Sequence, residues 1–114
     1  MPPLTDGAIL VQFRSVLANW NYTGFVTAKD IVLHWIAKNL RGRTLKDIAN
    51  AMNDHVSSGG IIDQVAETRP EWSHWPFHYD FRVPVGGRML YVETILQDAD
   101  PNDPTIHVVS IHDV

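Results

Sequence analysis

The chain has 114 residues, a formal net charge of -4, no cysteine, 45% hydrophobic residues and 19% charged residues. This length suits one domain, residues 1–114, and no apolar run approaches the roughly 20 residues that cross a bilayer. Without cysteine there is no disulfide, and the amino terminus lacks the basic start and apolar core of a secretory signal, so we expect a cytoplasmic location. The negative charge disfavours binding to RNA through a general attraction to phosphates.

The first predicted element is a helix that begins after Asp6, a residue suited to the N-cap position. Apolar residues then recur at the spacing of one helix face; they are Ile9, Leu10, Phe13, Val16, Leu17 and Trp20. Asn and Gly in "NWNYTGF" interrupt this pattern, so the helix is expected to end there.

A second helix is predicted from Thr27, whose hydroxyl could cap it while Asp30 acts as the acidic partner of a capping box. At 100° per residue, one narrow sector of this helix is polar and is expected to face solvent; it contains Asp30, His34, Lys38 and Arg41. Gly42 would end the helix. Thr44 and Asp47 repeat the capping signal for a third helix, which would form a helical hairpin with the second.

The segment after Ser57–Gly60 ("SSGG") has no helical periodicity. Alternating and β-branched residues instead predict strands within residues 61–68, 76–83, 88–96 and 105–114. The fold class is therefore predicted as α+β: three N-terminal helices in residues 1–58, then a mainly antiparallel sheet of three to four strands in residues 59–114.

The two best-defined strands form a predicted hairpin around Gly86 and Gly87. Strand alternation assigns its aromatic and branched residues to the core face and its polar residues to the other face; the polar set is His78, Asp80, Arg82, Tyr91 and Glu93. This face is either a solvated surface held by cross-strand charge pairs or a functional site, and the sequence leaves both readings open. The predicted core comprises Phe13, Leu17, Trp35, Ile48, Met52, Phe81, Val92 and Val109.

The sequence between the first two strands, "RPEWSHW", contains two tryptophans. Trp72 and Trp75 would either pack against the sheet or form a surface that binds a protein partner. No metal or cofactor is predicted, because Pro76 separates His74 from His78 and so prevents the helical spacing that would bring them together. The acidic run in residues 97–104 lacks the Gly and the terminal Glu of a calcium loop.

The order of these elements resembles a known fold group. A helical stretch, "HWIAKNLRGRTLKDIANAM", a Gly-rich break and strands ending in "YVETIL" and "IHVVSIHD" are similar to the RelE/ParE-like toxins and related small metal-independent ribonucleases, over roughly Thr27 to Val114. The resemblance implies catalytic positions at His78, Arg82, Tyr91 and Glu93, with His34, Lys38 and Arg41 contacting phosphates. The acidic charge and the leading helix depart from that pattern.

Two hypotheses follow from the sequence. The first is a non-enzymatic protein-interaction domain, and the second is a metal-independent endoribonuclease of toxin-like type that uses the outer face of the hairpin. Whether the chain is an enzyme, and in what oligomeric state it exists, is left open. An RNA-cleaving enzyme should gather Lys and Arg on the hairpin face, whereas a binding domain could leave that face mixed or acidic.

Overall fold

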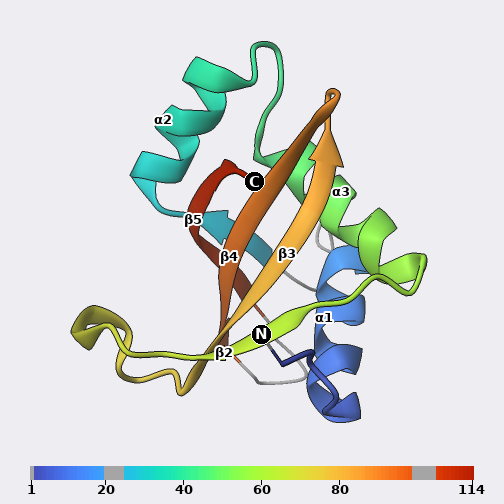
Figure 1. The fold of residues 1–114 in the computed structure, drawn as a ribbon, viewed down its shortest axis with the longest axis vertical. Coiled ribbons are helices and arrows are strands. Elements are labelled where there is room, and N and C mark those ends of the chain that lie inside the picture. The colour runs from blue at the N-terminus through green and yellow to red at the C-terminus, as the bar shows by residue number, and fades with distance from the viewer. Residues whose placement is uncertain (1, 20–24, 99–104) are drawn as a thin grey trace.

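The computed structural model describes residues 2–19, 25–98 and 105–114. Helices dominate the first half, with β1 between α1 and α2, and strands dominate the second half (Figure 1). In chain order the elements are α1 (Gly7–Asn19), β1 (Phe25–Ala28), α2 (Asp30–Asn39), α3 (Leu45–Ser57), β2 (Asp63–Ala66), the short 3-10 helix η1 (Pro70–Trp72), β3 (Phe77–Val85), β4 (Arg88–Asp98) and β5 (Thr105–Asp113).

Within the described residues the sheet has five strands, in the order β1-β5-β4-β3-β2. β1 and β5 run parallel, and the other neighbouring strands are antiparallel. The α+β class and the mainly antiparallel sheet are therefore confirmed. The finer prediction was wrong in two respects: the sheet has five strands rather than three to four, and β1 lies between α1 and α2, so the helices do not all precede the strands.

β1 was missed because its sequence carries a capping signal for a helix. Thr27 lies inside the strand, and Lys29 is the residue that precedes α2. The backbone of β1 pairs with β5, with Val26 opposite Ile106, and the pairing continues as Lys29 N donates to the Val108 carbonyl at 3.1 Å. A four-residue strand has little local signal, so the tertiary pairing determines its conformation.

The other two helix starts follow from the sequence. The Asp6 side chain accepts a hydrogen bond from the backbone N–H of Ala8 at 2.9 Å, as expected of an N-cap. Thr44 and Asp47 form the predicted capping box at the start of α3. Gly42, with φ of 77°, occupies the turn between α2 and α3.

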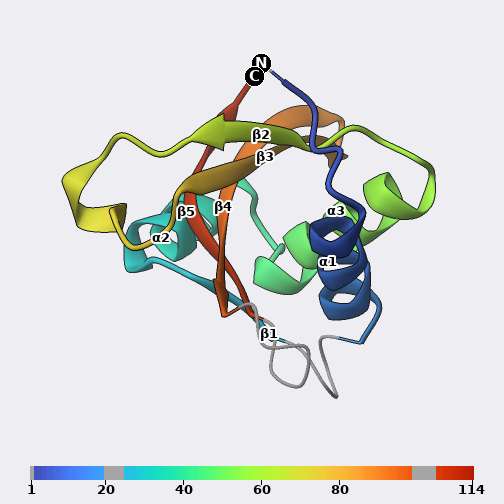
Figure 2. The same cartoon turned by 90° about the horizontal axis from the view of Figure 1, so that it is seen from below.

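α1 and α3 pack together and against β3, whereas α2 packs against β5 (Figures 1 and 2). The buried residues of all three helices belong to one core. Within the described residues α3 packs against α1 rather than against α2, so the predicted helical hairpin was wrong. None of the described helices is long and apolar enough to cross a membrane.

The core lies between the sheet and the three helices. The Phe13 ring of α1 contacts the rings of Tyr79 and Phe81 at centroid distances of 5.1 and 5.8 Å. Seven of the eight predicted core residues are buried. Trp35 is the exception: it is half-buried, and the Arg88 guanidinium lies over its ring at 5.5 Å.

The β3–β4 hairpin has the predicted orientation. Gly86 and Gly87 both have positive φ, 59° and 82°, as a two-residue hairpin turn requires. Phe81 lies opposite Val92 in the register, and both are buried on the side of α1 and α3. The alternate residues along β3 and β4 therefore point their side chains to the other face, which we call the outer face. Of the acidic run, residues 99–104 lie outside the described residues.

Candidate functional site on the outer face of the hairpin

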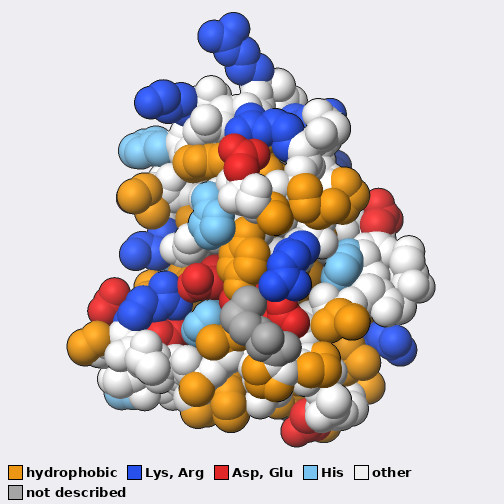
Figure 3. Space-filling model, viewed as in Figure 1, with side chains coloured by type: hydrophobic (Ala, Val, Ile, Leu, Met, Phe, Trp, Pro, Cys, Tyr) orange, Lys and Arg blue, Asp and Glu red, His pale blue; other side chains and the backbone are white. Residues whose placement is uncertain are grey.

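Polar and charged side chains gather on the outer face of β3 and β4 and of the neighbouring β2. Figure 3 shows acidic, basic and histidine side chains meeting in the middle of the molecule on this side. We call this group the outer-face cluster; it comprises Asp63, Glu67, Arg69, His78, Asp80, Arg82, Tyr91 and Glu93. Strand alternation explains the grouping, because side chains directly opposite one another in neighbouring strands share a face.

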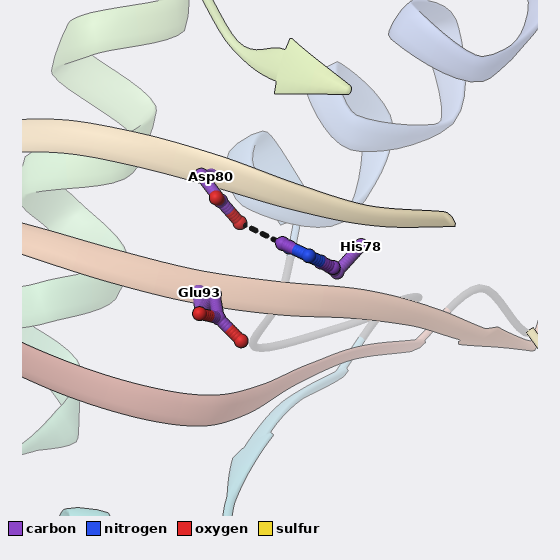
Figure 4. A group of neighbouring side chains, drawn as sticks. All are labelled: His78, Asp80 and Glu93. Atoms are coloured by element: carbon purple, nitrogen blue, oxygen red, sulfur yellow. Dashed lines mark hydrogen bonds and ion pairs between the residues drawn. The ribbon is translucent and has the colours of Figure 1, made fainter. Parts of the chain in front are cut away.

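Asp80 is at the centre of the cluster. Its side chain is 1% exposed, and its Oδ1 lies 2.7 Å from Nδ1 of His78 (Figure 4). The Tyr91 hydroxyl donates a short hydrogen bond to the other Asp80 oxygen. Both oxygens of this buried carboxylate therefore have donors, and the contact fixes the orientation of the His78 ring.

A second group joins the segment after β2 to β4. Arg69 donates to both oxygens of Glu67, at 2.9 and 3.0 Å, and its Nη2 also lies 2.7 Å from Glu93 Oε2. The 2.7 Å contact makes Glu93 a second ion-pair partner of the same guanidinium. The hydrogen bond from Arg69 lowers the pKa of Glu67 to about 2, so this carboxylate is ionised at neutral pH.

Arg82 belongs to a third group nearer the solvent. Its guanidinium lies 3.0 Å from the Asp63 carboxylate of β2 and 5.6 Å from the centre of the Tyr91 ring. On its other side, the Tyr91 ring stacks on His112 of β5, with centroids 5.1 Å apart and an interplanar angle of 7°. The row therefore crosses four strands, with Arg82 half-exposed at 51%.

The phenol of Tyr91 acts as a donor within this network. Burial raises the pKa of Tyr91, and the hydrogen bond to Asp80 raises it further, because an ionised phenol would lie against a carboxylate. Tyr91 therefore keeps its proton at neutral pH and donates it in the hydrogen bond to Asp80. This arrangement fits a positioning role for Tyr91, which holds Asp80 in place. It fits less well with a role in which Tyr91 releases a proton to a substrate.

A loop with two tryptophans covers the other end of the outer face. We call residues 67–76 the tryptophan loop; its ends are joined by a hydrogen bond from Glu67 N to the Pro76 carbonyl. The rings of Trp72 and Trp75 lie 5.9 Å apart, and Trp75 Nε1 donates to the Gln97 carbonyl of β4. Both rings are half-buried, so each packs against the sheet and keeps a solvent-facing part.

β5 and β1 support the tryptophan loop from beneath. The Trp72 ring lies 5.9 Å from the ring of His107, which is also 2.8 Å from the Thr27 hydroxyl of β1. The Lys29 ammonium lies 5.4 Å from the centre of the Trp72 ring. Ile95, whose cross-strand neighbour is His107, is fully buried at this end of the outer face.

Four residues predicted as catalytic, His78, Arg82, Tyr91 and Glu93, lie together in the outer-face cluster. The predicted phosphate contacts lie elsewhere: they are exposed on α2 and the turn after it, and comprise His34, Lys38 and Arg41. The sequence did not identify the residues that complete the cluster, which come from β2 and the tryptophan loop; these are Asp63, Glu67 and Arg69. Two acidic residues followed by a basic one in "DQVAETR" are a weak signal without the strand register.

The structure also brings together possible metal ligands that the sequence did not indicate. His78, Asp80 and Glu93 each offer one ligand atom, and these atoms lie within 4.8 Å of one another (Figure 4). Residues 78 and 80 alternate on β3, and Glu93 is directly opposite Asp80 on β4. The expected obstacle, Pro76 between His74 and His78, does not affect this set, because His74 is not part of it.

Comparison of the chain with protein-family models, curated proteins and solved structures found no match. The resemblance to the RelE/ParE-like group therefore stays a prediction.

Proposed function

We propose that this chain is a non-enzymatic protein-interaction domain, and that its binding surface is the tryptophan loop with the adjoining outer-face cluster. The charge of the cluster supports this most directly. It contains four carboxylates but two guanidiniums, and both guanidiniums lie against carboxylates: Arg69 against Glu67 and Glu93, and Arg82 against Asp63. A surface that binds RNA needs unpaired cationic groups for the phosphates. A mixed, acid-rich surface instead suits a protein partner with basic groups.

The tryptophan loop supports the same function. Half-buried tryptophans contribute strongly to protein interfaces, because a large rigid ring loses little conformational entropy on binding. Trp72 and Trp75 are already held in place by contacts with each other, with His107 and with the Gln97 carbonyl. The loop extends to the side of the molecule away from α1 and α3 (Figure 1), where a partner can approach it.

The test compares Trp75→Ala with Trp35→Ala, a matched change of a half-buried tryptophan on α2. Each immobilised variant and the wild type would be cross-linked to host proteins and the bound proteins quantified by mass spectrometry. We expect a protein partner that is depleted at least tenfold by Trp75→Ala and retained by Trp35→Ala. Circular dichroism would verify that both variants fold. The same bound set for all three proteins would contradict the proposed surface.

A second candidate is the metal-independent endoribonuclease. One observation favours it: His78, Arg82 and Glu93 lie in one cluster, and Asp80 holds the His78 ring as a carboxylate holds a catalytic imidazole. In this case His78 or Glu93 would accept the 2′-hydroxyl proton and Arg82 would stabilise the charged transition state.

The enzyme candidate is tested by incubating wild type and Arg82→Ala with single-stranded and structured RNA in EDTA. Discrete cleavage products from the wild type, with a cleavage rate about a hundredfold lower for Arg82→Ala, would establish the enzyme in place of the binding domain. No cleavage by the wild type between pH 5 and pH 9 would eliminate it.

A further inference from the structure

Three carboxylates lie side by side across three strands of the outer face. Asp63 of β2 is opposite Asp80 of β3, and Asp80 is opposite Glu93 of β4. Like charges directly opposite one another destabilise a sheet unless cations separate them. The two outer carboxylates have such cations, Arg82 at 3.0 Å from Asp63 and Arg69 at 2.7 Å from Glu93. Asp80 forms no ion pair with a Lys or Arg of the described chain.

The central carboxylate is also the most buried of the three. The side chain of Asp80 is 1% exposed, and its neighbours are the Tyr91 hydroxyl and the His78 ring. The cluster holds four carboxylates and two guanidiniums, so its carboxylates outnumber its guanidiniums by two. Burying such a surplus is costly unless a cation compensates it. A divalent ion has the charge that balances it.

The geometry provides a place for this ion beside Asp80. The ligand atoms of His78, Asp80 and Glu93 lie within 4.8 Å of one another (Figure 4). Ligands bound at about 2.1 Å are about 3.0 to 3.5 Å apart, so small side-chain rotations would close the set around an ion. The side chains of His78 and Glu93 are 13% and 18% exposed, which leaves access for solvent as a further ligand.

We propose that His78, Asp80 and Glu93 bind one divalent transition-metal ion, such as Zn²⁺ or Mn²⁺. One imidazole nitrogen and two carboxylates favour these ions over Ca²⁺, which takes six to eight oxygen ligands. Tyr91 would support the site from behind, because its hydroxyl holds one Asp80 oxygen. At the other oxygen the ion would replace the hydrogen bond from His78 Nδ1. This inference does not depend on the proposed protein interaction.

Arg69 lies next to this site, but its main partner is Glu67. Two hydrogen bonds join the guanidinium to Glu67, whose side chain is 1% exposed, whereas one contact, at 2.7 Å, joins it to Glu93. The Glu93 carboxylate can therefore turn towards a metal while Arg69 stays paired with Glu67. The ion would then lie on the side of Glu93 away from the guanidinium.

The experiment begins with protein treated with EDTA and dialysed into metal-free buffer. Zn²⁺ and, separately, Mn²⁺ are titrated in by calorimetry, and melting temperatures are recorded with and without each ion. We expect one ion per chain and a higher melting temperature with metal, because an ion that binds the folded state stabilises it. Glu93→Gln, which keeps the side-chain shape, and His78→Ala should each weaken the affinity at least tenfold. His74→Ala, a change of an exposed histidine in the tryptophan loop, should leave it unchanged.

Several results would overturn this site. One is the absence of saturable binding of both ions to the wild type, which would leave His78 as the cationic partner of Asp80. Another is binding that Glu93→Gln and His78→Ala leave unchanged, which would indicate adventitious coordination by surface histidines. Equal stabilisation by Ca²⁺ would exclude the transition-metal assignment. Circular dichroism of metal-free Glu93→Gln checks that a lost affinity does not reflect a lost fold.

Discussion

The two faces of the β3–β4 hairpin are formed by alternate residues of the same two strands but are stabilised in different ways. On the inner face, Phe81, Val83, Leu90 and Val92 are fully buried against α1 and α3. Their stabilisation depends on apolar area and shape, which many residue combinations can supply. Each contact there is weak, and the sum is large.

On the outer face, each side chain depends on a specific partner from another segment. Asp80 of β3 needs the Tyr91 hydroxyl of β4, and Glu93 of β4 lies against Arg69 of the tryptophan loop. A buried charge or donor without its partner costs more than the contact itself contributes. The inner face therefore determines the fold, whereas the outer face determines a particular arrangement of charges, which is what a binding or metal site requires.

The largest expected effect is on the inner face. Phe81→Ala removes a fully buried ring that packs against Phe13, and it should lower the free energy of unfolding by about 3 to 5 kcal/mol. The measurement is a urea denaturation series at pH 7. A midpoint equal to that of the wild type would mean that the two faces have been assigned the wrong way round.

The inner face could be predicted from sequence because its information is local. Alternation in "FHYDFRV" assigns Phe81 to the core without knowledge of its neighbours, and the Gly86–Gly87 turn brings the second strand into register with it. The same alternation assigned His78 and Arg82 to the outer face.

The residues of the outer-face cluster that lie outside the hairpin could not be predicted, because they come from segments whose positions depend on tertiary structure. Asp63 reaches the cluster through the register of β2 against β3. Glu67 and Arg69 reach it through the path of a loop, and no periodic pattern describes a loop. β1 was missed for a similar reason, since its four residues form a strand by pairing with β5.

A second prediction tests whether the outer face is more than a solvated surface. Asp80→Ala leaves the Tyr91 hydroxyl and the His78 Nδ1 without their acceptor in a largely buried position, so it should cost about 2 to 3 kcal/mol. The same urea series measures this loss. As a control, Asp54→Ala changes an exposed carboxylate of α3 and should cost less than about 0.5 kcal/mol. Equal, small losses for both variants would show that the outer face is held only by solvent-screened charges.

A third prediction concerns acid. The pKa of Glu67 is lowered from 4.5 to about 2 in the folded chain, mainly by the hydrogen bond from Arg69. The stabilisation is therefore complete above the unfolded-state pKa near 4.5 and is lost as the pH falls towards 2. Because Arg69 is about one-third exposed, solvent screening limits the effect to about 1 to 2 kcal/mol. The difference in unfolding free energy between pH 5 and pH 3 should be smaller by this amount in Glu67→Gln. An unchanged difference would remove this ion pair from the stabilising interactions.

The smallest predicted effect is at the other end of the outer face, where His107 lies between Trp72 and Thr27. Burial lowers the pKa of His107, and Lys29 lowers it further, so the folded state disfavours the imidazolium. The unfolded chain then binds a proton more readily, and stability should fall as the pH drops through the ordinary histidine value of about 6.5. We expect a loss of about 0.5 to 1 kcal/mol between pH 7 and pH 5 that is absent in His107→Gln.

His34→Gln, on the exposed side of α2, should keep the wild-type pH dependence. Because the Trp72 ring lies against His107, a shift of tryptophan fluorescence over the same pH range would place the change at the tryptophan loop. If His107→Gln keeps the full pH dependence, the loop and the outer-face cluster respond to acid through other groups, and the contact between His107 and Trp72 serves packing alone.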